Sequence, residues 1–305
     1  MEYISCDLCG RDDYDTLLPE CKTLDGPLVQ CRHCGLIYVN PRQTNFSVQE
    51  KTKNPSGVRE AVWEKYSQIW NASLLSTDNE MGHIRANFEF RLEKIRQHIS
   101  SGSLLDIGSG KGHFLAVARD MGFSPTVGVE PNSQTAAFAR QRYDLEIVPL
   151  LDDSVFAENT FDVITMFHVI EHLFSPRQEM HKVYKILHPD GFLFVEAPTI
   201  DTIWFRLLKE RWREFIPDHY FFFTPKTIRA LLISQGFEVL NISTIGKRMS
   251  VRFLFSRLWR YNRRLASFLV QTAERTRIAD REVYLNLGDV MLVIAKKQEL
   301  LDEPQ

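Results

Sequence analysis

The sequence lacks the long apolar runs that mark membrane-spanning and secretory segments. No stretch of about 18 consecutive apolar residues occurs in the chain. The N-terminus, MEYISCDLCG, has neither the basic start nor the apolar core of a signal peptide. These two absences predict a cytoplasmic protein. An excess of charge is missing as well, because the formal net charge of the 305 residues is −2. This balance excludes a surface built throughout for binding phosphates.

Cysteine is scarce, but four of the five cysteines stand in two C-x2-C pairs. A gap of two residues lets both sulfurs of a pair reach one ion, and four thiolates complete a tetrahedral zinc shell with no position left for a substrate. Two disulfides or free thiols are the alternatives, and Cys21 is interpreted as a loop or packing residue. We therefore predict a structural zinc ribbon over residues 1–45. Its expected ligands are Cys6, Cys9, Cys31 and Cys34.

The segment predicted to bind zinc is acidic, with four Lys or Arg against seven Asp or Glu in residues 1–45. That balance is a poor match for phosphates, so nucleic acid is not the favoured partner. We expect contact with another part of the chain or with the substrate. Residues 46–100 are interpreted as a polar linker and two helices, over residues 61–75 and 84–99, where apolar residues recur at helical spacing.

From residue 101 to about residue 300, short apolar runs alternate with helical patterns. This alternation indicates an α/β fold with a parallel sheet and right-handed crossovers. We predict a Rossmann-like seven-stranded sheet, with a helical insertion over residues 246–288 before the last strand. The seven expected strands are LLDIG, TVGVE, EIVPL, FDVITMF, FLFVEAP, FEVLNISTI and DVMLVIAKK.

A glycine-rich loop, LLDIGSGKG, joins the first expected strand to the first expected helix. Its glycines allow a ligand to lie directly on the backbone, and the helix N-terminus offers free N–H groups. A dinucleotide fingerprint would need a further glycine where the chain has His113, which disfavours a dehydrogenase. Glu130 ends the second expected strand, where an acid can accept hydrogen bonds from both hydroxyls of a ribose.

An acid two residues before G-x-G-x-G resembles the first motif of class I S-adenosylmethionine methyltransferases. The segments LLDDSVFAENTFDVITMFHVIEHL and LHPDGFLFVEAPT resemble the third to fifth strands of that family, so the resemblance covers roughly residues 100–245. It implies S-adenosylmethionine as cofactor. In related enzymes an aromatic closes over the cofactor, which is one interpretation of Tyr66, the other being a packing residue. The cofactor-binding residues that it implies are Asp106, Gly108, Gly110, Gly112, Glu130, Leu151 and Asp152.

The segment FHVIEH leaves the fourth expected strand at the edge where ligands of such sheets bind. If it is helical, His168, Glu171 and His172 share one face. The block is similar to the E-x-x-E-H block of small-RNA 2′-O-methyltransferases and ubiquinone-pathway O-methyltransferases, which binds a divalent ion. Here a histidine replaces the first glutamate, and His219 is similar to a downstream histidine of the RNA enzymes.

Three roles remain open for this block. His168, His172 and His219 are the catalytic candidates, one of them acting as general base in the acceptor pocket. A second divalent metal near Glu171 is the first alternative. A purely structural role of the Glu171–His172 pair is the other.

Residues 247–264 contain seven basic and no acidic residues. Drawn as one helix, they separate apolar and basic faces. Three interpretations compete: a lid that meets an anionic acceptor, a helix that makes peripheral contact with acidic lipid, and a solvated helix with a core-facing stripe.

We expect a methyltransferase that acts on a small molecule, by O-methylation of a sugar, polyketide or envelope-glycan precursor. RNA methylation is the alternative within enzymes. A non-catalytic binding protein with a cofactor fold is the alternative outside them.

Overall fold

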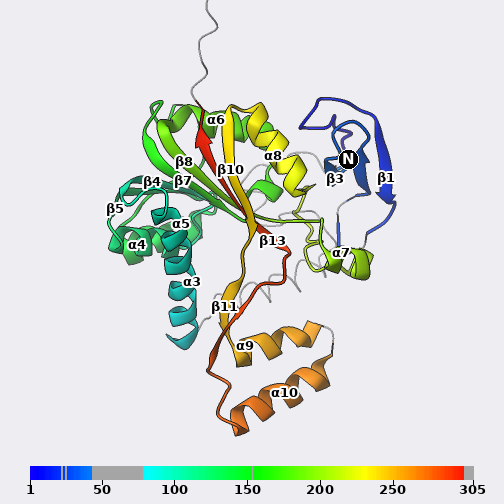
Figure 1. Ribbon diagram of the computed structural model, residues 1–305, viewed down its shortest axis with the longest axis vertical. Coiled ribbons are helices and arrows are strands. Elements are labelled where there is room, and N and C mark those ends of the chain that lie inside the picture. The colour runs from blue at the N-terminus through cyan, green and yellow to red at the C-terminus, as the bar shows by residue number, and fades with distance from the viewer. Residues whose placement is uncertain (22, 25, 43–77, 153, 261, 299–305) are drawn as a thin grey trace, which may run out of the picture.

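A seven-stranded sheet forms the centre of the computed structural model, which describes residues 1–21, 23–24, 26–42, 78–152, 154–260 and 262–298 (Figure 1). The strand order is β10-β13-β8-β7-β4-β5-β6. Each strand lies on one of the expected apolar runs, so the predicted Rossmann-like fold is confirmed. The strands are β4 (Gly102–Ile107), β5 (Phe123–Val129), β6 (Glu146–Val148), β7 (Phe161–Phe167), β8 (Leu187–Pro198), β10 (Phe237–Thr244) and β13 (Val290–Lys297).

One strand departs from the expected parallel arrangement. The pairs among β4, β5, β6, β7 and β8 are parallel, but β13 runs antiparallel to both of its neighbours, β8 and β10. The chain leaves the end of β10 and re-enters the sheet as β13 at that same end of the strands. A return at the same end needs no crossover helix, so the direction of the last strand is reversed.

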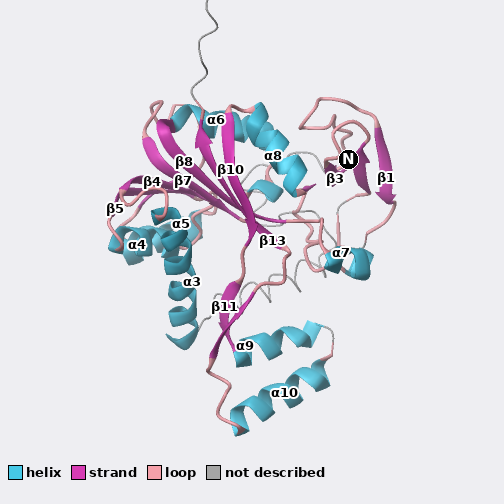
Figure 2. Cartoon of the chain, in the orientation of Figure 1, coloured by secondary structure: helices cyan, strands magenta, loops and turns pink. Residues whose placement is uncertain are grey.

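Helices cover both faces of the sheet (Figure 2) and form two apolar cores. Consecutive strand residues point to opposite faces, so Leu104 packs in one core and Leu105 in the other. A strand that is buried on both sides is largely apolar, which explains the nearly continuous apolar runs in the sequence. The helices of the first face are α3 (Asp78–Arg96), α4 (His113–Asp120) and α5 (Ser133–Tyr143), and those of the second are α6 (Pro176–Ile186) and α8 (Pro225–Ser234).

The N-terminal sheet combines three strands from the start of the chain with one strand from the segment between β8 and β10, near residue 221. Its strands β1 (Tyr14–Leu18), β2 (Leu28–Cys31) and β3 (Ile37–Val39) are joined by β9 (Phe221–Phe222), which pairs antiparallel with β3. The cysteine-bearing segment is therefore hydrogen-bonded to the larger domain through its own sheet.

Side chains strengthen this junction. The buried Arg42 donates from Nη2 to the carbonyl oxygen of Phe174 at 2.7 Å. Its guanidinium lies 5.1 Å from the ring centroid of Phe174 and 5.5 Å from that of Tyr220. Asp7 accepts hydrogen bonds from the Ser175 hydroxyl and the Arg177 N–H, at 2.6 and 2.8 Å, at the start of α6.

Between β10 and β13 the chain forms a separate projection, which we call the arm. It comprises β11 (Lys247–Ser250), α9 (Val251–Ser256), a 3-10 helix η3 (Arg257–Arg260), α10 (Arg263–Arg275) and β12 (Glu282–Leu285), with β11 paired to β12. It extends below the sheet in Figure 1.

The single helix drawn over residues 247–264 is therefore wrong. The first four residues are a strand because they find a partner in β12, far along the chain. Ser250 then caps α9 by accepting from the Phe253 N–H, and Asn262 caps α10 by accepting from the Leu265 N–H.

The described part of the chain also contains three short helices: η1 (Ile170–His172), α7 (Ile203–Leu208) and η2 (Lys209–Arg211). The helix expected over residues 61–75, including Tyr66, lies outside the described residues. Among the helices that the structure describes, none is long and apolar enough to cross a membrane.

Candidate active site

The strand order creates a switch point between β4 and β7. From β4 the chain proceeds outward through β5 and β6, then returns to the other side of β4 as β7. Open α/β sheets bind ligands in the crevice outside the carboxyl ends of the strands at such a point. The glycine loop follows β4 and the histidine segment follows β7, so the fold brings the two together.

The glycines of the loop have different tasks. Gly108 has a φ of +77°, and a Cβ placed there would lie 2.3 Å from Cγ2 of Val169, so the loop packs directly on the histidine segment. At Gly112 a Cβ would lie 2.9 Å from Cβ of Ala139 in α5. At Gly110, with a φ of +53°, a Cβ would meet no described atom within 4 Å. The backbone at Gly110 is therefore left open to a ligand.

Glu130 joins the glycine loop to the start of α5. Its Oε2 accepts from the Gly110 N–H at 2.9 Å and its Oε1 from the Asn132 N–H at 2.8 Å. Burial raises the pKa of this half-buried carboxyl. Each oxygen keeps a further lone pair for a ligand hydroxyl. With the open backbone at Gly110, this arrangement fits the ribose and amino-acid parts of S-adenosylmethionine.

Asp106 lies near the end of β4, directly before the glycine loop. It is 4% exposed, and its Oδ1 accepts from the Thr165 hydroxyl at 2.6 Å. Burial raises the pKa of Asp106 to about 7, with the nearby charge of Glu130 adding to the effect. A carboxylate buried in this way favours a cationic group beside it.

Leu151 and Asp152 follow β6, at the carboxyl edge of the sheet. Leu151 is buried, and its carbonyl oxygen accepts from Lys182 Nζ at 3.2 Å. The exposed Asp152 accepts from the N–H and hydroxyl of Ser154, which lowers the pKa of its carboxyl. Their position beside adenine stays a prediction. Tyr66, the remaining cofactor candidate, lies outside the described residues.

The segment after β7 is not the α-helix that would align three side chains on one face. Only Ile170–His172 is helical, as one 3-10 turn. His168 has a φ of +57°, and its N–H donates to the Glu196 carbonyl at 2.8 Å, which extends the pairing of β7 with β8. Its Nδ1 nevertheless lies 3.5 Å from Glu171 Oε1, so the two side chains are adjacent.

Glu171, His172 and His219 form one group. One potential ligand atom from each lies within 4.8 Å of the others, and the two imidazole centroids are 4.5 Å apart. Glu171 is 1% exposed, and burial raises its pKa to about 7. Within the described ranges neither of its carboxylate oxygens, nor Nδ1 of His219, has a hydrogen-bond partner. Buried polar atoms of this kind indicate a ligand or an ion.

Asp218, which the sequence analysis missed, adjoins this group. Its Oδ2 lies 3.3 Å from His172 Nδ1, and its carbonyl oxygen lies 3.0 Å from the same atom. Burial alone would lower the pKa of His172, but the charge of Asp218 outweighs it and raises that pKa to about 9. Burial and the charge of His172 lower the pKa of His219 to about 3. At neutral pH His172 is thus the cationic ring and His219 the neutral one.

A buried ion pair, also missed, lies behind His168. Arg91 of α3 places Nε 2.7 Å from Glu196 Oε1 and donates from Nη2 to Oε2 at 2.8 Å. Burial holds the pKa of His168 well below its usual range, and the positive charges of Lys247 and Arg91 lower it further. Asp218 could have been noticed as the neighbour of His219 in PDHY. The Arg91–Glu196 pair has no signal in the sequence.

Backbone hydrogen bonds connect the histidine group to the N-terminal sheet. The Tyr220 N–H donates to the Glu171 carbonyl and the Val39 N–H donates to the Tyr220 carbonyl, both at 2.9 Å. The position of His219 therefore depends on β3 as well as on the large sheet.

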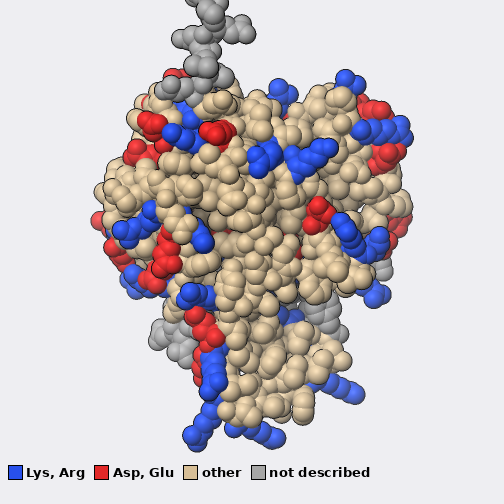
Figure 3. Space-filling model, in the orientation of Figure 1, with Lys and Arg blue, Asp and Glu red and all other residues tan. Residues whose placement is uncertain are grey.

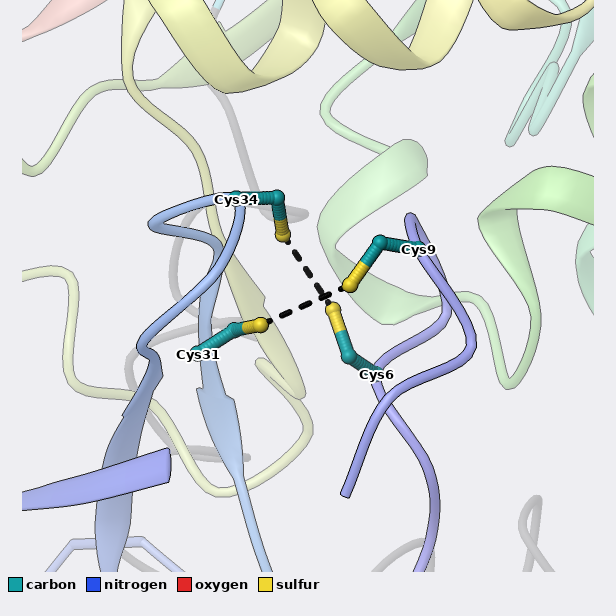
Figure 4. Close-up of side chains that lie close together, drawn as sticks. All are labelled: Cys6, Cys9, Cys31 and Cys34. Carbon is teal, nitrogen blue, oxygen red and sulfur yellow. Dashed lines mark hydrogen bonds between the residues drawn. The ribbon is translucent and has the colours of Figure 1, made fainter. Parts of the chain in front are cut away.

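The four paired cysteines converge at the other end of this small sheet (Figure 4). The Sγ atoms of Cys6 and Cys34 are 3.4 Å apart and those of Cys9 and Cys31 are 3.5 Å apart, all four lying within 4.8 Å of one another. A disulfide would need about 2.05 Å. Sulfurs around a tetrahedral zinc ion, with Zn–S near 2.3 Å, lie about 3.8 Å apart. The donor set therefore fits one thiophilic ion. Cys21 is buried outside the cluster.

The sequence of residues 80–242 matches the family model of a methyltransferase domain. This match covers more than half of the 305 residues. The chain belongs to the methyltransferase domain family.

Relatives of this methyltransferase match over shorter segments. The ubiquinone biosynthesis O-methyltransferase of Caulobacter vibrioides is 35% identical over 99 residues, which are 30% of this chain and 39% of that protein. A protein of Mycolicibacterium smegmatis, described as a probable S-adenosylmethionine-dependent methyltransferase, is 27% identical over 130 residues, 38% of this chain and 48% of its own. The methyltransferase thus spans less than half the length of these two curated relatives.

Solved structures share the fold. An S-adenosylmethionine-dependent methyltransferase of Thermotoga maritima superposes with a TM-score of 0.51 at 17% identity, covering 78% of this chain and 99% of that one. At this identity the likeness shows the class I methyltransferase fold alone.

Replacing Asp106 with asparagine tests the effect of burial on this carboxyl of the methyltransferase. Because the folded state raises its pKa from 3.8 to about 7, its stabilising contribution is complete below pH 3.8 and is lost as the pH rises through about 7. The amide stays neutral and can still accept from Thr165. In urea unfolding without cofactor, we expect the free energy of unfolding of the variant to exceed that of the wild type by roughly 1–3 kcal/mol at about pH 8. Near pH 4 the two free energies should be equal. A difference that does not change with pH would contradict the assignment.

Proposed function

We propose that this methyltransferase transfers the methyl group of S-adenosylmethionine to a hydroxyl group of a small molecule. The observation that supports it most is the contact between the two halves of the site. The loop with the open backbone at Gly110 packs, through Gly108 and Val169, on the segment that bears Glu171 and His172. The groups that we propose for cofactor binding and for acceptor activation thus lie at adjacent strand ends.

The reaction requires alignment and the removal of one proton. Bound S-adenosylmethionine supplies the methyl group: the acceptor oxygen forms a bond to the methyl carbon, and the methyl–sulfur bond breaks with its electron pair left on sulfur. The hydroxyl proton must pass to a base. His168 and His219 are both neutral at pH 7 because burial lowers their pKa values. His168 is the proposed proton acceptor. It lies next to Glu171 but is not one of the three residues, Glu171, His172 and His219, whose ligand atoms come together.

We further propose that Glu171, His172 and His219 hold a divalent cation. Support comes from the three ligand atoms within 4.8 Å and from the buried oxygens of Glu171. Asp218 binds His172 through Nδ1, as a carboxylate behind a metal-binding histidine commonly does. Nε2 of His172 is then the atom for the ion, which would displace the proton from this otherwise cationic ring. Two imidazoles and one carboxylate favour zinc, manganese, iron or cobalt over magnesium. Such an ion would lower the pKa of an acceptor hydroxyl that binds it.

The four paired cysteines are proposed to hold a structural zinc ion. Their sulfurs have the separation that a shared ion needs, and the segment that they hold together is too short to build a large core of its own. The ion would stabilise β3 and, through β3, the β9 strand next to His219.

For the acceptor we propose a sugar, polyketide or envelope-glycan precursor. The Caulobacter vibrioides relative is, by its description, an O-methyltransferase of ubiquinone biosynthesis, which supports a hydroxyl on a small molecule. The acidic balance of residues 1–45 disfavours RNA as the acceptor.

Cofactor binding is tested by Gly110→Ala. The new methyl group meets no described atom, so the variant should fold with a loss of about 1 kcal/mol from its left-handed backbone, yet it should occupy the ligand's space. We expect calorimetry to show a Kd for S-adenosylmethionine at least about tenfold higher. Gly122→Ala, at a φ of +99° on the opposite edge, is the matched control and should bind normally. Equal affinity in both variants would contradict the proposed cofactor site. If the site is supported, the methyl acceptor is sought by screening the wild type with labelled cofactor.

The proposed cation site is tested by Glu171→Gln, which keeps the shape and removes the charge. We expect one manganese or cobalt ion per wild-type chain in this site, with affinity about 10- to 100-fold weaker in the variant, because a buried carboxylate ligand is lost. Equilibrium dialysis measures this without any turnover. Glu179→Gln on α6 is the charge-matched control. Unchanged metal affinity together with slower methyl transfer would assign Glu171 to proton handling or positioning instead.

Zinc at the cysteines is tested by Cys6→Ser, with Cys21→Ser as control. We expect metal analysis to find about one zinc ion per chain in the wild type and in the control, and less in Cys6→Ser. Hydrogen exchange should then rise in β2, β3 and β9 together, because these strands share one sheet. Full zinc content in Cys6→Ser would contradict the ligand set.

A further inference from the structure

The arm presents bulky apolar side chains to the solvent. On α10, Leu265 and Phe268 are 47% and 64% exposed and lie one helical turn apart, and Trp259 of η3 is 54% exposed. The buried side of α10 is formed by the small residues Ala266 and Ala273. The helix thus packs on the arm through alanines, with Leu269 and Val270 partly buried, and leaves Leu265 and Phe268 exposed, which stability alone does not favour.

Positive charge surrounds this apolar surface. The arm, residues 247–285, contains ten Lys or Arg and three Asp or Glu. The three acids pair with Arg248 and Arg252, away from the start of α10. Figure 3 shows Lys and Arg side chains gathered at the lower end of the molecule, where the arm lies. Arg263 and Arg264 are exposed in the first turn of α10, next to Leu265. Cations at a helix N-terminus oppose the helix dipole, so this placement costs stability unless an anionic surface meets them.

We propose that the arm docks on an anionic lipid bilayer. Trp259, Leu265 and Phe268 would enter the interfacial region, and Arg263 and Arg264 would contact the headgroups. An exposed apolar ridge with flanking arginines and a tryptophan is the composition of an interfacial element. Each cation near an anionic surface also adds to the attraction. This inference goes beyond the proposed methyl transfer and does not depend on it.

Two other occupants fit the surface less well. In a symmetric contact between two copies, the acid of α10 that could meet Arg263 and Arg264 of the other copy is Glu274, and that carboxylate is already paired with Arg252 of its own chain. RNA would satisfy the arginines but would leave Leu265 and Phe268 beside a charged backbone.

The arm joins the sheet at the same end as the candidate active site. It leaves the sheet at the carboxyl end of β10 and returns at the start of β13, and both lie on the edge where the glycine loop and the histidine group lie. A docked arm would therefore turn the ligand-binding edge toward the bilayer.

Vesicle sedimentation with the full chain tests the inference. We expect binding to vesicles of phosphatidylcholine with about one-third phosphatidylglycerol, little binding to phosphatidylcholine alone, and weaker binding as salt rises. Leu265→Ser/Phe268→Ser should reduce partitioning at least about tenfold. Arg263→Gln/Arg264→Gln should reduce it about fivefold per arginine. Ile233→Ser, which removes a 55% exposed side chain from α8, is the matched control and should bind as the wild type does.

Circular dichroism and cofactor affinity, measured on the same variants, separate loss of docking from loss of fold or of the methyltransferase site. Absence of binding to anionic vesicles at low salt overturns the proposal. It is also overturned if Leu265→Ser/Phe268→Ser binds vesicles as Ile233→Ser does. Two further results would contradict it: a dimer, seen by light scattering, that covers Phe268, and displacement of the protein from the vesicles by single-stranded RNA that binds α10.

Discussion

The absence of a side chain at position 108 is the constraint on which the site depends. Val169 occupies the space that a Cβ would fill, so the loop after β4 and the segment after β7 lie in contact. Without that contact the two strand ends would still be neighbours in the sheet, but the open backbone at Gly110 and the buried Glu171 would be held apart by a layer of side chains. The steric demand of one residue thus couples the glycine loop to the segment that bears Glu171.

Buried carboxyl groups are the second feature of the site. Asp106 and Glu171 each have a raised pKa because they are removed from water with few compensating partners. Arg91 and Glu196 are buried as well but are paired. Unpaired buried carboxyls are costly in the free protein, and that cost is recovered when a cationic ligand or a metal ion arrives. These carboxyls favour positive charge beside them, which the proposed sulfonium cofactor and divalent ion would supply.

The small N-terminal sheet takes part in the architecture of the site. β9 belongs to the larger domain by sequence and to the cysteine-bearing sheet by hydrogen bonding. Arg42 is held against aromatic rings of the larger domain, where loss of its contacts would leave a buried guanidinium. A structural ion at the cysteines would accordingly stabilise more than the segment that binds it.

The strands of the sheet, the glycine loop and the paired cysteines could be predicted from the sequence alone. Each depends on residues within one short segment: an apolar run for a buried strand, glycines where the backbone must turn or open, and two residues between paired thiols. The direction of β13, the division of residues 247–264 into β11, α9 and α10, and the pairing of β9 with β3 needed the tertiary structure. So did the partners Asp218 and Arg91. In these cases the deciding neighbour is distant in the chain, and local periodicity has no record of which strand, carboxylate or guanidinium the fold will place opposite.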